Sequence, residues 1–147
     1  MPILNLSNSI SKTFSRVPTI IADEDFSSDT GGFTASVSPG ATVTVSGGKL
    51  VVRDDGSSGG YAVLEMTCHG STTYSYSIDY TDDAPGNGPM KIGTSANDNS
   101  LKNVNLAAEG TFTGTFTTAS KSIFLTLVVT NANRVLKFDN LLIQENN

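Results

Sequence analysis

The stretch RVLKFDNLLIQ, Arg134–Gln144, decides how this chain folds. It has the apolar content of a buried strand, yet Asp139 and Asn140 interrupt it. Successive side chains of a strand point to opposite faces, so Phe138 and Leu141 would lie on opposite sides of a regular strand. Both can enter one core only if an extra residue is accommodated between them, which a β-bulge does. The stretch therefore predicts a strand with a bulge at Asp139–Asn140.

A carboxylate that a bulge releases from the apolar row still needs partners, either backbone amides or a cation. A second acidic stretch, IIADEDFSSDTGGF at Ile20–Phe33, supplies oxygen atoms near the other end of the chain. Its carboxylates are Asp23, Glu24, Asp25 and Asp29. Because the first and last strands of a sandwich are often neighbours, we expect these two stretches to lie side by side.

The clearest local signal between them is ATVTVSGGKLVVR, residues 41–53. Gly47-Gly48 suits a two-residue hairpin turn, and apolar residues alternate on both sides of it. This turn predicts two facing pairs on one side of the hairpin, Val45 with Leu50 and Val43 with Val52.

The other strand-like segments are short and are separated by turn residues. They are YAVLEMTC (61–68), TTYSYSIDY (72–80), MKIGTS (90–95), a short segment at 101–106, TFTGTFT (111–117) and SIFLTLVVT (122–130). With turn signals about every 8–12 residues, they predict eight to ten strands in an all-β, antiparallel two-sheet jelly-roll sandwich. The predicted domain covers residues 20–147.

Charge and cysteine content limit the function classes. The net charge is −5 and the pI about 4.6, which does not suggest a nucleic-acid partner. No apolar run approaches the roughly 18 residues of a membrane span, and residues 1–19 do not resemble a signal peptide. Cys68 is the only cysteine, so no internal disulfide forms, and we expect a small packed side chain. These features suit assembly in a reducing cytoplasm.

Residues 1–19 differ from the remainder of the chain. All fourteen acidic residues lie at or beyond Asp23, whereas residues 1–22 carry a charge of +2. The segment is read either as a floppy terminus or as an extended arm that orders on a partner. In the second reading the docking residues are Ile3, Leu4, Leu6, Ile10, Lys12, Phe14 and Arg16.

The two acidic stretches together resemble the ends of carbohydrate-binding-module (galactose-binding-like) jelly rolls attached to xylanases and glucanases. Those domains begin with an apolar pair, an acidic residue and Phe, and they close with an aromatic residue, Asp, Asp or Asn, and an aliphatic residue. The resemblance covers about Ile20 to Glu145. It implies a structural calcium ion between the first and last strands, held here by Glu24 or Asp25 with Asp139 and by carbonyl oxygens. The alternative is that Asp139 accepts backbone hydrogen bonds.

The sugar site of that family carries over less directly, because its exposed Trp is missing and the chain has no Trp. Where that family has the Trp of a Gly-Trp pair, this chain has Phe33, and we expect its side chain to lie in the core. Glycan candidates are Tyr61, Tyr74, Tyr76 and Tyr80, and the last three alternate as a core stripe would. We therefore expect at most weak sugar binding.

Residues for catalysis or zinc are sparse. His69, the only histidine, lies beside Cys68 without a second ligand pair, and we read it as a surface turn residue. The pairs Asp54-Asp55 and Asp82-Asp83 are adjacent in turns, whereas glycosidases need two opposed carboxylates. The sequence predicts a protein that is not an enzyme.

Two functions remain open. The first is a virion structural protein, similar to phage decoration (head cement) proteins, assembled in the host cytoplasm and docked by its arm on a major capsid or tail protein. A homo-oligomer, for example a trimer, is compatible with this reading. The second is a free-standing carbohydrate-binding module that recognises a polysaccharide or cell-surface glycan.

Overall fold

The computed structural model describes residues 17–37, 40–56, 59–82, 88–132 and 134–146. Within these ranges the regular structure consists of strands. They are β1 Ile20–Glu24, β2 Thr34–Ala35, β3 Ala41–Ser46, β4 Lys49–Asp54, β5 Gly60–Thr67, β6 Thr72–Asp82, β7 Pro89–Gly93, β8 Lys102–Asn105, β9 Gly110–Thr118, β10 Ser122–Val129 and β11 Val135–Glu145.

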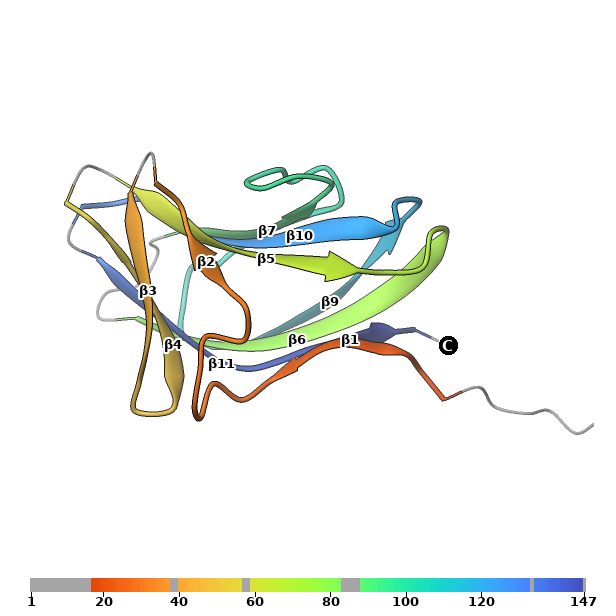
Figure 1. Cartoon of the computed structure of the whole chain (residues 1–147), viewed down its shortest axis with the longest axis horizontal. Coiled ribbons are helices and arrows are strands. Elements are labelled where there is room, and N and C mark those ends of the chain that lie inside the picture. The colour runs from red at the N-terminus through yellow and green to blue at the C-terminus, as the bar shows by residue number, and fades with distance from the viewer. Residues whose placement is uncertain (1–16, 38–39, 57–58, 83–87, 133, 147) are drawn as a thin grey trace, which may run out of the picture.

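These strands form two antiparallel sheets that pack face to face (Figure 1). The six-stranded sheet has the order β3-β4-β11-β6-β9, with β1 also paired to β11. The five-stranded sheet has the order β2-β5-β10-β7-β8. The predicted all-β jelly-roll sandwich is confirmed, and the described residues form more strands than the eight to ten expected.

The β3–β4 hairpin has the predicted register. Val43 pairs with Val52 and Val45 with Leu50. Gly47 and Gly48 have φ angles of 60° and 72°, which is the left-handed backbone that a two-residue turn of type I′ requires at both positions.

The last strand, β11, lies at the centre of the six-stranded sheet and contains the predicted bulge. Its residues Asp139 and Leu142 pair with Asp79 and Ser77 of β6, so β11 uses one residue more than β6 over this interval. Asn140 lies at this irregularity, and its backbone has a left-handed φ angle of 48°. As a result Phe138 and Leu141 are both buried, 0% and 1% exposed.

The bulge also marks a change of neighbour along the other edge of β11. Before it, Val135–Phe138 pairs with β4, and after it Leu141–Gln144 pairs with β1. The first and last strands are therefore adjacent, as expected, and the start of β1 lies beside the C-terminal end of β11 (Figure 1).

The core fills the space between the sheets and is rich in aromatic residues. Phe138 packs against Tyr80 with ring centroids 5.5 Å apart, and Tyr74 stacks on Phe116 at 5.6 Å. Phe33 is buried, as predicted, and contacts Phe26. Cys68 is also buried, where its thiol donates to the carbonyl of Ser120 at 3.2 Å, and burial raises its pKa.

The proposed arm lies almost wholly outside the described residues, including Ile3, Leu4, Leu6, Ile10, Lys12, Phe14 and Arg16. Of its described part, Val17 is exposed, and the carbonyl of Thr19 accepts a hydrogen bond from the amide of Glu145. The docking role of residues 1–19 stays a prediction. Within the described ranges, no helix has the length and apolar character needed to cross a membrane.

Candidate functional site: the outward face of the five-stranded sheet

The tyrosines of β6 do not form a binding surface. Tyr74, Tyr76 and Tyr80 are 0%, 5% and 1% exposed and point between the sheets. Tyr76 lies over Gly114 of β9, where an added Cβ would be 2.5 Å from the tyrosine hydroxyl oxygen. A ring in this position cannot stack on a sugar from outside. The prediction that these three tyrosines bind a glycan is therefore wrong, and the alternative that they form a stripe in the core is confirmed.

Two other aromatic side chains lie on the outward face of the five-stranded sheet. Tyr61 of β5 and Phe124 of β10 are both half-buried. They share a face because Tyr61 pairs with Val128, which is four residues along β10 from Phe124. At about 3.3 Å per residue, the two rings lie roughly 13 Å apart along the strands. They can therefore contact different units of an extended chain.

Polar and apolar residues surround these rings in a regular array, which we call the outer platform. Phe124 lies between Glu65 of β5 and Gly93 of β7 in the pairing register. The next row along the sheet consists of Val63, Thr126 and Lys91. Glu65 accepts a hydrogen bond of 2.8 Å from the hydroxyl of Ser122. Aromatic, hydroxyl, carboxylate and ammonium groups thus converge on one surface.

The loop between β7 and β8 rises over this platform (Figure 1). Its Asn97 donates from the backbone amide to Thr126 at 2.9 Å, and its side-chain oxygen accepts from the ammonium of Lys91 at 2.8 Å. The loop is therefore anchored to both β10 and β7.

Asp98 organises the loop internally. Its carboxylate accepts hydrogen bonds from the hydroxyl of Ser100 at 2.5 Å and from the amide of Thr94 at 2.8 Å. These bonds, with that of Ser100 first in size, lower the pKa of Asp98 to about 2. Gly93 leaves the space for this carboxylate, because a Cβ there would be 2.4 Å from an Asp98 oxygen. The loop next to Phe124 is thus already shaped before any ligand arrives.

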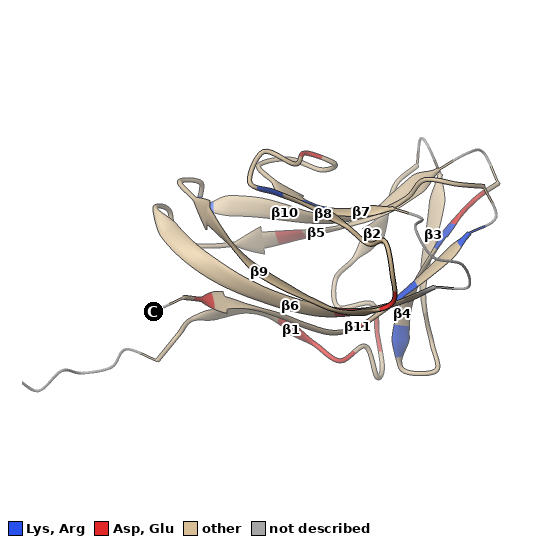
Figure 2. Ribbon diagram, turned by 180° about the vertical axis from the view of Figure 1, so that it is seen from behind, with Lys and Arg blue, Asp and Glu red and all other residues tan. Residues whose placement is uncertain are grey.

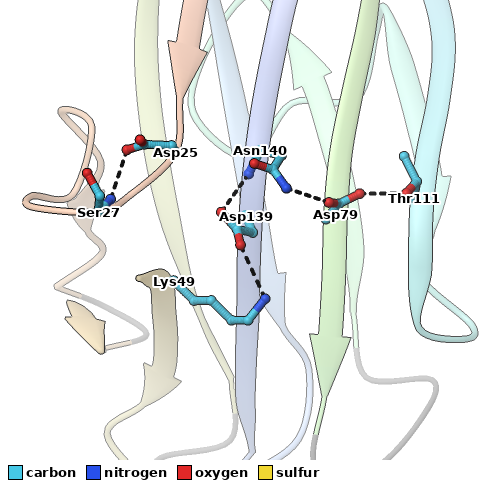
Figure 3. Close-up of polar contacts among 7 residues, drawn as sticks. All are labelled: Asp25, Ser27, Lys49, Asp79, Thr111, Asp139 and Asn140. Carbon is cyan, nitrogen blue, oxygen red and sulfur yellow. Dashed lines mark hydrogen bonds and ion pairs between the residues drawn. The ribbon is translucent and has the colours of Figure 1, made fainter. Parts of the chain in front are cut away.

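Two of the residues predicted to hold calcium have partners within the chain. Asp25 accepts from the amide of Ser27 at 2.9 Å, while Asp139 faces the ammonium of Lys49 at 3.3 Å (Figure 3). Asp139 also accepts from the amide of Asn140 at 2.9 Å. In the part of the chain that is described, no three His, Cys, Asp or Glu side chains gather in a metal-binding group. Asp139 thus has a backbone amide and a cation as partners, and the calcium site stays a prediction.

A short polar chain continues from the bulge across β6 to β9. The amide nitrogen of the Asn140 side chain donates to Asp79 at 2.7 Å, and the hydroxyl of Thr111 donates to the other Asp79 oxygen at 2.6 Å (Figure 3). The bond from Asn140, followed by that from Thr111, lowers the pKa of Asp79. Together these contacts stabilise the strained bulge from the outward side.

His69 lies in the turn between β5 and β6, as predicted, but it has a partner that sequence analysis missed. Its Nδ1 is 2.5 Å from a carboxylate oxygen of Glu145, whose side chain is only 3% exposed. The contact links residues 76 positions apart in sequence. It pairs the end of the last strand with the β5–β6 turn and indicates a structural role for the histidine.

Neither a family model nor a curated protein sequence matches this chain. Solved structures do share its fold. The CBM22-1 xylan-binding domain of Paenibacillus barcinonensis Xyn10C superposes with a TM-score of 0.65 at 16% identity, over 89% of this chain and 97% of that domain. The N-terminal cellulose-binding domain of Cellulomonas fimi β-1,4-glucanase C has a TM-score of 0.64 at 17% identity, over 88% and 98%.

A third match is the CBM22-1–GH10 pair of Clostridium thermocellum Xyn10B in complex with xylohexaose. Its TM-score is 0.60 at 15% identity, over 89% of this chain and 29% of that one. At such identities the likeness establishes the fold alone. The chain therefore has the jelly-roll fold of carbohydrate-binding modules, as the resemblance of its two ends implied.

Proposed function

We propose that this protein is a non-catalytic carbohydrate-binding protein that holds a polysaccharide chain on its outer platform. The observation that carries the proposal is the pair Tyr61 and Phe124, which present aromatic rings on one outward face. Aromatic faces attract the polarised C–H groups of a sugar through their quadrupole. Glu65, Lys91 and Asn97 provide the few polar groups that orient a ligand in such a site.

The fold supports the same proposal. The similar structures include domains described as xylan-binding and cellulose-binding, and one was solved with xylohexaose. These are not virion proteins, so they favour the carbohydrate-binding hypothesis over the virion hypothesis that sequence analysis placed first. A polysaccharide with a backbone like that of xylan or cellulose is accordingly the ligand class to test.

The expectation of weak sugar binding rested on the buried tyrosines of β6. Tyr61 was one of the four glycan candidates, and Phe124 was not a candidate. Both belong to the surface that this proposal uses, so we now expect binding that is measurable with soluble polysaccharides.

The test is affinity electrophoresis in gels containing soluble xylan or hydroxyethyl cellulose, with Tyr61→Ala and Phe124→Ala. Each substitution should weaken binding roughly tenfold, which corresponds to about 1.4 kcal/mol. The matched control is Thr113→Ala, an exposed residue of β9 on the outward side of the other sheet. If folded Tyr61→Ala and Phe124→Ala variants bind as the unaltered protein does, the platform is not the site.

A further inference from the structure

A separate groove of about 560 Å³ lies on the outward side of the six-stranded sheet, the opposite sheet from the outer platform. We call it the cationic groove. Its lining residues are Thr42, Thr44 and Ser46 of β3, Val51 and Arg53 of β4, and Val135 and Lys137 of β11. Among these described residues there are two cations and no carboxylate. That is notable in a chain with a net charge of −5.

The two cations are close neighbours on the sheet. Arg53 pairs with Val135, and Lys137 pairs with Val51. Arg53 and Lys137 are therefore diagonal neighbours on adjacent strands, with Cα atoms roughly 7–8 Å apart. Their long side chains can reach a single anionic group. Figure 2 shows basic segments on β4, at the end of the sandwich remote from the C-terminus.

The remaining lining residues suit a polar ligand with some apolar surface. Val51 and Val135 are 8% and 9% exposed and form the floor between the cations. The hydroxyls of Thr42, Thr44 and Ser46 come from alternate positions of β3, so they form one row beside that floor. A hydroxyl both donates and accepts hydrogen bonds, as the hydroxyls of a sugar do.

We propose that the cationic groove binds an acidic polysaccharide, with a carboxylate or sulfate group held between Arg53 and Lys137. A guanidinium group matches the geometry of such anions with two parallel hydrogen bonds. Nucleic acid fits less well, because single-stranded chains rely on aromatic stacking and none of the described residues that line the groove is aromatic. The choice of a saccharide rests on the proposed function, whereas the requirement for an anion rests on the groove alone.

The test measures binding of polygalacturonate and of chondroitin sulfate by isothermal titration calorimetry at 50 mM and 500 mM NaCl. The two probes distinguish a carboxylate from a sulfate, and binding of either supports the proposal. Arg53→Gln and Lys137→Gln should each weaken binding roughly tenfold at low salt. The matched control is Lys121→Gln, which removes the same charge from an exposed turn between β9 and β10. It should change the affinity less than twofold.

The outcomes are separable from those of the outer platform. Tyr61→Ala alters only the outer platform, so it should leave polygalacturonate binding unchanged. Arg53→Gln alters only the cationic groove, so it should leave xylan binding unchanged. Equal losses in Lys121→Gln and Arg53→Gln would show that removing any surface cation weakens binding, and would overturn the groove. Unaltered affinity in Arg53→Gln and Lys137→Gln would do the same. Equally tight binding of single-stranded DNA would overturn the assignment to a saccharide.

Discussion

The ammonium group of Lys49 lies 3.3 Å from a carboxylate oxygen of Asp139, and this ion pair links the β3–β4 hairpin to the bulge of β11. The two residues are 90 positions apart in sequence. Their side chains are 35% and 22% exposed, so water screens the pair only in part. The carboxylate that the resemblance assigned to calcium thus has a cation of the protein's own beside it.

This pair predicts coupled effects of Lys49→Met and Asp139→Asn on the free energy of unfolding. Each single substitution should destabilise the protein, and the double substitution should cost less than their sum. The difference should be about 0.2–1 kcal/mol, the range for partly exposed ion pairs. Urea unfolding of the four proteins measures it, and strictly additive losses would show that the two groups do not interact.

The same arrangement leads to a prediction about calcium. Because Asp139 already has an ammonium group and a backbone amide as partners, we expect the same melting temperature in millimolar calcium and in chelator. A metal that binds only the folded state would instead raise the melting temperature with concentration. A calcium-dependent rise that disappears in Asp139→Asn would restore the site implied by the resemblance.

Asn140 is predicted to be replaceable by Gly at lower cost than by Ala. Its φ angle of 48° is left-handed, a conformation that costs most residues roughly 1–2 kcal/mol. Asn140→Ala should lower the free energy of unfolding by about this amount, and Asn140→Gly by less. In both variants the pKa of Asp79 should rise toward its ordinary value, since the bond from Asn140 is the main cause of its low pKa. Chemical unfolding and NMR titration give the two readouts. Equal stability of the Ala and Gly variants would rule out backbone strain.

Tyr76 and Tyr61 should respond to alanine in opposite ways. Tyr76 is buried over Gly114, so Tyr76→Ala should lower the free energy of unfolding by about 3–5 kcal/mol, as aromatic truncations in cores do. Tyr61→Ala removes a half-buried ring from the outer platform and should cost much less stability but most of the polysaccharide affinity. Thermal unfolding measures the stability of the two variants, and affinity electrophoresis measures their polysaccharide binding. A stable Tyr76→Ala variant with lost binding would contradict the assignment of the two faces.

Asp98 should make the free energy of unfolding depend on pH in the acidic range. Its pKa is about 2 in the folded protein and about 3.9 in an unfolded chain. A lowered pKa means that the carboxylate stabilises the fold above about pH 4, and that this contribution is lost as the pH falls through 2. The stability difference between the unaltered protein and Asp98→Asn should therefore be full at pH 7 and small near pH 2. Ser100→Ala should raise the pKa of Asp98 in an NMR titration, because its hydroxyl provides the largest of the stabilising bonds.

Much of the architecture could be predicted from local patterns. Gly47-Gly48 with alternating apolar residues specified the hairpin register, because a two-residue turn fixes which residues face each other. Phe138 and Leu141 around Asp139–Asn140 specified a bulge, because two apolar residues three positions apart cannot otherwise share one face. The outward position of Phe124 was also available from the sequence. Ile123 and Leu125 flank Phe124, and in a strand they share the face opposite to it.

The binding surfaces, in contrast, depend on which strands become neighbours. Tyr61 and Phe124 lie on one surface only because β5 pairs with β10, and Arg53 approaches Lys137 only because β4 pairs with β11. The same holds for Lys49 with Asp139 and for His69 with Glu145, whose partners are 90 and 76 positions away. Alternation within a strand determines which face a side chain takes, and the sequence contains that information. Which residues meet across two strands is decided by the pairing of the whole sheet, which only the tertiary structure shows.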